Sequence, residues 1–195
     1  AAITLVAEAF VPAAGRVVVQ HDAYGGTWRL FTFLASQGRF EVDFVDFNDD
    51  AALDEALDRS PALVWIETPS NPLLRITDIA ATAARAHAVG ALVAADNTFL
   101  SPLLQRPLEH GVDIVIHSTT KFINGHSDVV GGAAVAADPE VHTKLRLWAN
   151  ALGLTSSPFD AYLTLRGLRT LDARLRVHES NTAALVRLLD GHPAV

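Results

Sequence analysis

Short hydrophobic runs alternate along the chain with longer segments that have helical spacing. Six of these runs predict strands, at residues 16–20, 41–47, 62–67, 91–96, 112–118 and 129–137. Most are continuously apolar, which is typical of strands buried on both faces of a parallel sheet. The run at 41–47 instead alternates apolar and acidic residues, which favours a place at the edge of the sheet.

The segments between the strands predict helices. They cover residues 1–10, 27–37, 48–60 and 77–90, a helix starting at Asp138-Pro139, and one long or bent amphipathic helix from Phe159 onward. Thr77 is the predicted N-cap of its helix, and Gly38 and Gly90 are predicted to end the helices that precede them. The alternation predicts an α/β fold of three layers, with a mostly parallel sheet between helices.

Composition narrows the possible environments and partners. The 195 residues are 50% hydrophobic and 19% charged, with a formal net charge of −7. The negative charge argues against nucleic acid or an anionic membrane as the main partner. No apolar run approaches the roughly 20 residues that span a bilayer, and the absence of cysteine excludes disulfides and thiolate metal sites. We expect a soluble, cytoplasmic protein, and its first and last residues suggest a piece of a longer chain.

Polar residues follow four of the predicted strands at the point where each strand ends. The stretches are "HDAYGGT", "IETPSNP", "ADNTF" and "HSTTK". Ligands of open α/β sheets bind beyond the carboxyl ends of the strands. The four stretches therefore predict one polar, partly buried pocket.

Asp96 and Lys121 are the two charged residues of these stretches that raise a question of function. Asp96 ends an apolar run, so its carboxylate either caps the next turn or faces a cation supplied by a ligand. Lys121 is one of only two lysines, beside Lys144, among fifteen basic residues. It is either a surface side chain or a reactive amine suited to forming a Schiff base, which arginine cannot do because it stays protonated.

Neighbouring residues extend this set. Ser118 and Thr120 flank the lysine motif and are either turn formers or hydroxyl donors to a phosphate. Tyr24 precedes two glycines at the start of a predicted helix, where it either packs or stacks on a flat ring, while the helix N-terminus favours an anion. An imine-forming lysine, a carboxylate for a pyridinium nitrogen, phosphate donors and a stacking ring together describe a pyridoxal phosphate (PLP) site.

A metal site is the competing chemistry. His110, His117, His126 and Asp128 lie close together in the sequence. Their spacing does not repeat on one face of a helix or strand, so we expect surface or supporting histidines and no metal.

Several motifs resemble one known family. The stretches "YGGTWRLF", "ETPSNPLLRITDIA", "ADNTFLSPLLQRPLEHGVDIVIHSTTKFINGHSDVVGG" and "FDAYLTLRGLRTL" closely resemble the Cys/Met-metabolism family of PLP enzymes. The similarity covers essentially the whole chain. It implies that residues 1–155 form a PLP-binding large domain like that of aspartate aminotransferase. Residues 156–195 would form a long helical segment that leads to a C-terminal domain.

The resemblance also implies roles for individual residues. Lys121 would carry the cofactor as a Schiff base and move protons at Cα and Cγ, and Asp96 would keep the pyridinium nitrogen protonated. Tyr24 would stack over the ring and assist proton transfer, with Thr98 supporting the ring. Ser118 and Thr120 would bind the phosphate. Asn71 would contact the cofactor's phenolic oxygen and the substrate carboxylate. Arg29 would bind the far carboxylate of a succinylated substrate.

The implied activity is a γ-replacement on amino-acid substrates, in which O-succinylhomoserine and cysteine give cystathionine and succinate in methionine biosynthesis. Relatives with the same core cleave cystathionine or methionine, or use O-acetylhomoserine; Gly26 counts mildly against the methionine-cleaving group, which usually has cysteine there. A non-catalytic structural homologue is the alternative of a different class. The family also implies a homotetramer, a dimer of dimers that share active sites. Its preceding Ser-Gly-Met segment, N-terminal arm and substrate-binding C-terminal arginine have no counterpart in these 195 residues.

Overall fold

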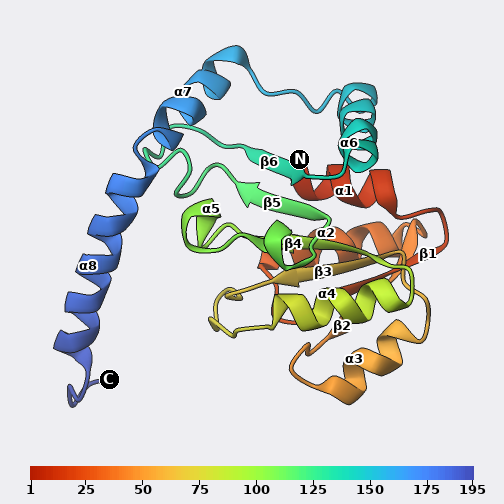
Figure 1. The fold of residues 1–195 in the computed structure, drawn as a ribbon, viewed down its shortest axis with the longest axis horizontal. Helices are drawn as coiled ribbons and strands as arrows, with labels where there is room; N and C mark the ends of the chain where they lie inside the picture. The colour runs from red at the N-terminus through yellow and green to blue at the C-terminus, as the bar shows by residue number, and fades with distance from the viewer.

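A six-stranded sheet forms the centre of the protein in the computed structural model, which describes residues 1–195 (Figure 1). Its strands are β1 (Gly15–Gln20), β2 (Phe40–Val45), β3 (Leu63–Glu67), β4 (Leu92–Asp96), β5 (Ile114–Ser118) and β6 (Gly132–Ala136). They lie in the order β2-β1-β3-β4-β5-β6. Pairing is parallel from β2 to β5 and antiparallel between β5 and β6. The mostly parallel sheet is therefore confirmed, and the alternating strand β2 lies at the edge, as expected.

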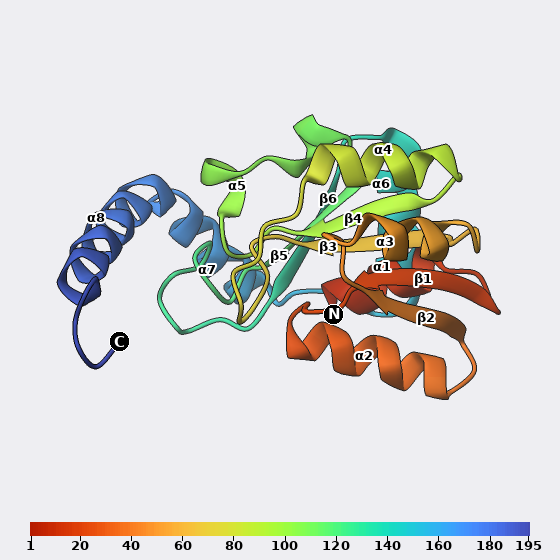
Figure 2. The same ribbon diagram turned by 90° about the horizontal axis from the view of Figure 1, so that it is seen from below.

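Helices cover both faces of the sheet, giving the predicted three layers (Figure 2). One face packs against α1 (Ala2–Phe10), α2 (Gly25–Ser36) and α6 (Pro139–Ala151); the other packs against α3 (Asp50–Leu57) and α4 (Ile79–Ala88). Successive strand residues point to opposite faces. In β3, Trp65 therefore joins the core under α1 and α2, while Val64 and Ile66 join the core under α3 and α4. Trp65 is fully buried and meets Phe31 of α2 edge to face, with ring centroids 5.5 Å apart.

The helix boundaries show where local sequence rules were incomplete. Asp78 is the N-cap of α4, because its carboxylate accepts the N–H of Ala81; the prediction of Thr77 is wrong by one residue. Thr77 is instead buried, and its N–H donates to the Thr68 hydroxyl. A carboxylate at this position also complements the positive end of the helix dipole. Helix α2 begins at Gly25, two residues earlier than predicted, and the chain turns at Gly38 with φ of 72°.

The C-terminal part of the chain extends away from the sheet. The helix predicted from Phe159 onward is bent into α7 (Pro158–Leu168) and α8 (Leu171–Leu189). Figure 1 shows α8 projecting from the body, and only Leu171 and Leu175 of its 19 residues are buried. The two short elements α5 (Ser101–Leu104) and the 3₁₀ helix η1 (Pro107–His110) complete the fold. None of the helices combines the length and the apolar character that crossing a membrane requires.

Candidate active site

A cavity of about 1290 Å³ opens at the carboxyl end of the parallel strands. All four polar stretches singled out in the sequence contribute residues to its lining. The stretch "HDAYGGT" contributes Tyr24 alone. The predicted cofactor residues that line it are Tyr24, Asn71, Asp96, Thr98, Ser118, Thr120 and Lys121. Residues more than 90 positions apart in the sequence thus meet around one space.

The strand register explains why acidic and hydroxyl side chains meet on one side of the sheet. Glu67 of β3 pairs with Asp96 of β4, which pairs with Ile116 of β5. Residues two apart on a strand share a face. Ser118 therefore lies on the same face as Ile116, which packs in the core beneath α1 and α2. The ends of three neighbouring strands direct Glu67, Asp96 and Ser118 toward this face.

Asp96 is held by the turn that follows its strand. Its Oδ1 atom accepts the backbone N–H of Thr98 at 3.0 Å and also the Thr98 hydroxyl hydrogen. No lysine, arginine or histidine forms an ion pair with it. Although one side of the carboxyl borders the cavity, the surrounding protein removes most of its water. This burial raises the pKa of Asp96, while the hydrogen bonds from Thr98 act in the opposite direction. A cation bound in the cavity would restore the charged form.

Hydroxyl and helix N–H groups face each other across another part of the cavity. Ala1, Ala2 and Ile3, at the start of α1, line the cavity together with Ser118 and Thr120. The first N–H groups of a helix have no partner within the helix and favour an anion. The Ser118 N–H donates to the Thr98 hydroxyl at 2.8 Å, and Ser118 itself lines the cavity. The Thr120 hydroxyl accepts the N–H of Gly131 at 3.0 Å.

Lys121 lies in a tight turn directly after β5. Its N–H donates to the Ser118 carbonyl, and its carbonyl accepts the Gly125 N–H at 2.8 Å. Its side chain is exposed and borders the cavity. The backbone after it is clamped from α8, because Arg174 donates to the carbonyl of Phe122 at 2.7 Å and to that of Gly167 at the same distance. The helical segment thus fixes the loop that carries the lysine.

Gly167 explains how closely α7 approaches this loop. A Cβ atom at position 167 would lie 2.2 Å from the carbonyl oxygen of Asn124. Only glycine permits this contact without a backbone shift. The close approach completes the small core in which Ile123 packs against Leu171 and Leu175.

Tyr24 and Asn71 border the cavity from loops on the side of α2. Tyr24 is the N-cap of α2, and its ring folds back so that a Cβ on Gly26 would lie 2.3 Å from the Tyr24 Cε1 atom. A side chain at position 26 would therefore have to displace the Tyr24 ring. The ring is 47% exposed, which leaves it free to contact a ligand.

Glu67 also lines the cavity, and the sequence reasoning did not single it out. The signal was present, since Glu67 ends an apolar strand in the same way as Asp96. Its side chain is buried, and its Oε2 atom accepts the Tyr24 N–H at 2.8 Å. Burial, together with the nearby charges of Asp96 and Asp22, raises the pKa of Glu67 to about 8.

Arg29 is the predicted site residue that does not line the cavity. It is exposed on α2, and its Nη1 atom lies 3.4 Å from where a Cβ of Gly25 would be. The guanidinium therefore folds back toward the first turn of α2, next to Tyr24. Tyr24, the residue before Gly25, does line the cavity.

The histidines considered for a metal are distributed without a common centre. No group of three or more His, Asp or Glu side chains is arranged to hold a metal ion. His117 points away from the face of Ser118 because neighbouring strand residues alternate. It is buried, which lowers the pKa of its imidazole, and its Nδ1 atom has no hydrogen-bond partner.

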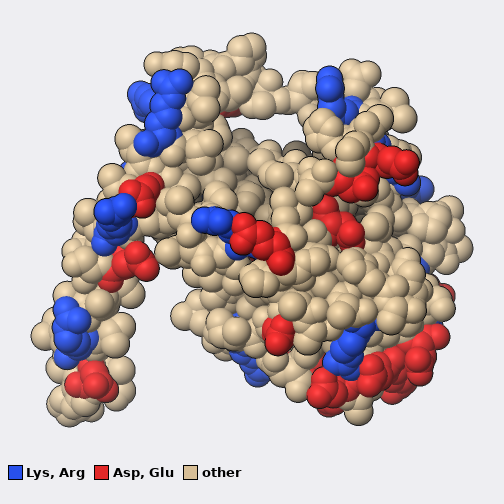
Figure 3. Space-filling view, viewed as in Figure 1, with Lys and Arg blue, Asp and Glu red and all other residues tan.

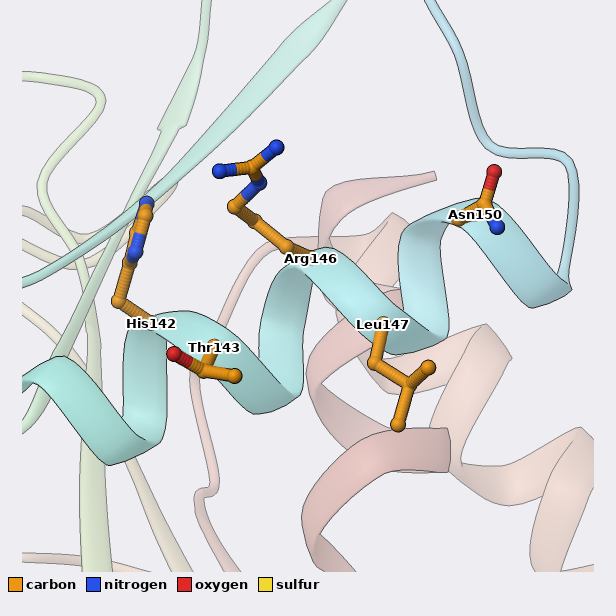
Figure 4. A pocket seen from close by; sticks show the side chains of 5 residues that line it. All are labelled: His142, Thr143, Arg146, Leu147 and Asn150. Atoms are coloured by element: carbon orange, nitrogen blue, oxygen red, sulfur yellow. The ribbon is translucent and has the colours of Figure 1, made fainter.

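A second hollow of about 370 Å³ lies over α6 (Figure 4). His142, Arg146 and Asn150 project from one side of the helix, whereas Leu147 points the opposite way. Side chains of a single helix that do not converge cannot enclose a ligand. The large cavity is thus the candidate active site.

Figure 3 shows that acidic side chains gather over α3, at the foot of the molecule in that view.

Comparison with known proteins identifies the relatives of this chain. The family model described as "Cys/Met metabolism PLP-dependent enzyme" matches residues 1–195. Cystathionine γ-synthase of Escherichia coli is 51% identical over 194 residues, covering 100% of this chain and 50% of that protein. Cystathionine γ-lyase of Dictyostelium discoideum is 46% identical, covering 92% of this chain and 46% of that protein.

A solved structure gives the same result. The crystal structure of cystathionine γ-synthase from Xanthomonas oryzae, in complex with aminoacrylate and cysteine, has a TM-score of 0.97 and 62% sequence identity. The match covers 98% of this chain and 50% of that chain. The chain thus spans about half the length of the relatives it matches.

Proposed function

The chain belongs to the Cys/Met metabolism PLP-dependent enzyme family, and from that premise we propose that it is the cofactor-binding half of a cystathionine γ-synthase. The proposed reaction replaces the succinyloxy group at Cγ of O-succinylhomoserine with the sulfur of cysteine, releasing succinate and forming cystathionine. Identity of 51% and 62% to two synthases supports this choice. The observation that carries it is the meeting of Lys121 and Asp96 at one cavity.

The cavity fits the chemistry of PLP at three points. Asp96 is a largely desolvated acid that has no cationic side chain as a partner, so it suits a pyridinium nitrogen. The hydroxyl of Ser118 and the N-terminus of α1 form a region that favours a phosphate. Lys121 supplies an amine at the cavity wall. When bound, PLP supplies an electron sink for the electron pair left at the substrate Cα.

The position of each residue in the cavity would determine its role in the reaction. Lys121 would hold the cofactor covalently through Nζ; once free, its amine would take protons from the substrate Cα and Cβ and return protons to these two carbons after sulfur has replaced succinate at Cγ. Asp96 would keep a proton on the pyridinium nitrogen, and Thr98 would hold that carboxylate in place through the two hydrogen bonds to Oδ1. Ser118 and Thr120 would bind the phosphate.

Tyr24, Asn71 and Arg29 would orient the ring and the substrate. Tyr24 would cover the ring and assist proton transfer, and Asn71 would contact the phenolic oxygen and the substrate carboxylate. Arg29 would bind the far carboxylate of the succinyl group with its planar fork of donors. Its place beside Tyr24, outside the cavity lining, suits a contact with the distal end of a long substrate.

We extend the proposal to a homotetramer of paired subunits that share active sites. Apolar side chains on α7 are exposed, among them Phe159 at 68% and Tyr162 at 60% exposure. This supports the proposal that another subunit covers α7. Exposed apolar groups that lie together are typical of interfaces. The mass of the intact protein in solution tests this part of the proposal.

Covalent cofactor binding is tested by colour and labelling. The intact protein loaded with PLP should be yellow, and borohydride should bleach it while leaving a stable label on the peptide that contains Lys121. Lys121→Ala should take up no label, whereas Lys144→Ala, the matched lysine on α6, should behave as the wild type. Equal labelling of the Lys121→Ala variant would refute the assignment. A protein that takes up no PLP at all would support a non-catalytic homologue.

The choice between synthase and lyase is tested by turnover. The γ-lyase relative at 46% identity makes cleavage of cystathionine the second candidate. We expect faster turnover of O-succinylhomoserine with cysteine than of cystathionine alone. A preference for cystathionine alone would overturn the synthase proposal and leave the PLP site intact.

A further inference from the structure

Glu67 is a buried acid at the cavity for which the proposed reaction has no use. It ends β3, a strand whose five residues are all buried, and its side chain is directed to the face that α2 covers. Only 4% of the residue is exposed, yet it lines the same cavity as Asp96. An acid is rarely buried without a partner, so the contacts of its oxygens indicate what it does.

The carboxyl of Glu67 holds the first residue of the α2 cap. Its Oε2 atom accepts the Tyr24 N–H at 2.8 Å, a contact between residues 43 positions apart. Tyr24 has no side-chain cap of its own, and Glu67 accepts the N–H of this N-cap residue, the contact that the N3 acid makes in a capping box. The Asn71 backbone also interacts with this carboxyl. Glu67 therefore lies between the backbones of two residues proposed to contact the cofactor.

The position of the Tyr24 backbone decides where its ring lies. The ring folds over Gly26, leaving no room for a Cβ there. The ring lies against its own helix turn, so a shift of the Tyr24 backbone displaces it. A hydrogen bond at the Tyr24 N–H is thus a means of orienting the ring at the cavity.

We propose that Glu67 is a positioning residue, which fixes the Tyr24 ring over the cofactor by holding the Tyr24 N–H. The part that concerns the cofactor rests on the proposed function. The contact itself rests only on this chain.

The charges around Glu67 determine the form in which it acts. Asp96 at the end of β4 and Asp22 after β1 face it with like charge, and the Tyr24 N–H faces it from α2. Lys121 borders the same cavity from the turn after β5, whereas the His117 side chain points to the opposite face of the sheet. Burial and the two like charges raise the pKa of Glu67 to about 8, so near neutrality the carboxyl is protonated. A neutral acid can accept the Tyr24 N–H without placing a second negative charge beside Asp96.

Two substitutions separate this role from a general contribution to folding. Glu67→Gln keeps a neutral side chain with an acceptor oxygen of the same reach, whereas Glu67→Ala removes the acceptor. Asp49→Ala is the matched control, because Asp49 also caps a helix, accepting the Ala52 N–H at the start of α3, but lies outside the cavity.

The readouts are cofactor affinity, the visible circular dichroism of bound PLP, and hydrogen exchange at Tyr24 in the cofactor-free intact protein. Glu67→Ala should weaken PLP binding about tenfold, as expected for loss of a hydrogen bond to a buried carboxyl. It should also diminish the visible dichroism and speed exchange at Tyr24. Glu67→Gln should stay within about threefold of the wild type, and Asp49→Ala should change neither the dichroism nor the exchange.

The outcomes distinguish this inference from the proposed function. Wild-type dichroism and slow Tyr24 exchange in Glu67→Ala would overturn the positioning role while leaving PLP binding in place. A Glu67→Gln variant as impaired as Glu67→Ala would overturn the claim that a neutral acceptor suffices. If the wild type binds no PLP, the proposed function fails, and the exchange rate at Tyr24 still decides whether Glu67 holds it.

Discussion

The ends of β3 and β4 carry the same pattern and use it differently. Each strand is an apolar run that ends in an acid, and the two acids, Glu67 and Asp96, are register partners on one face of the sheet. The carboxylate of Asp96 accepts both hydrogen bonds from Thr98, two residues further along. Glu67 instead reaches the N–H of Tyr24 in a distant segment.

Side-chain length and the origin of the donors account for the difference. The shorter Asp96 is held by its own turn and presents its open side to the cavity, where a cation can bind. The longer Glu67 extends to the α2 cap and is closed off from water. Both acids have raised pKa values because both lose water. The comparison teaches that an acid at a strand end acquires its role from the donors that surround it.

Removing the charge of Asp96 should have the largest effect of the changes that test this comparison. Asp96→Asn should lower turnover by about a hundredfold to several thousandfold, because loss of one partner of a buried ion pair costs about 3–5 kcal/mol. Steady-state rates and PLP titration of the intact protein measure the effect. Asp113→Asn is the control, since Asp113 accepts the Val93 N–H at the opposite end of the sheet. An Asp96→Asn variant with normal turnover would show that Asp96 does not face the cofactor.

The protonation of Glu67 predicts a pH dependence of stability. Its pKa rises from 4.5 to about 8 on folding, so between these values the folded state holds one proton more than the unfolded state. The free energy of unfolding then decreases as pH rises, by roughly 2–3 kcal/mol between pH 5 and pH 7. This contribution is complete below pH 4.5 and is lost as pH rises through about 8.

Urea unfolding of the cofactor-free protein at pH 5 and pH 7 measures this slope. Glu67→Gln cannot titrate, so subtracting its slope removes the contribution of every other group. Parallel slopes for the wild type and Glu67→Gln would mean that Glu67 is charged in the folded protein at neutral pH.

The hydroxyl of Thr98 offers the mildest test, on the Asp96 side of the comparison. It donates to Asp96 and accepts the Ser118 N–H at 2.8 Å. Thr98→Val should weaken PLP binding by about 1–2 kcal/mol, close to tenfold, because it leaves that N–H unpaired and removes a donor to the carboxylate. Thr98→Ser keeps the hydroxyl and should bind PLP nearly as the wild type does. Equal loss in both variants would show that loss of the hydroxyl does not account for the effect, because Thr98→Ser keeps it.

Much of the fold followed from local pattern. The continuous runs predicted the buried parallel strands β1, β3, β4 and β5, although the run at 129–137 became the antiparallel, partly exposed strand β6. The alternation in β2 predicted its edge position, because exposure on one side is visible in the residues themselves. Caps were less predictable. Thr77 and Asp78 are both good N-caps, and the choice of Asp78 depended on Thr77 being drawn into the buried contact with Thr68.

The site followed the same division. The polar stretches correctly indicated a pocket at the carboxyl end of the sheet, since parallel strands bring their ends together. They did not reveal that Arg29 lies outside the cavity lining or that the Thr120 hydroxyl also accepts the N–H of Gly131. These outcomes depend on helix orientation and on loops distant in the sequence.

The sequence by itself determined the strands, the strand ends that meet, and the types of chemical group placed there, because periodicity and residue type are local properties. Only the tertiary structure decided which donors each acid receives. Asp96 is bound by its own turn, whereas Glu67 is bound by a backbone N–H 43 residues away. Desolvation and hydrogen bonding depend on such neighbours, and strand order and helix placement bring them together.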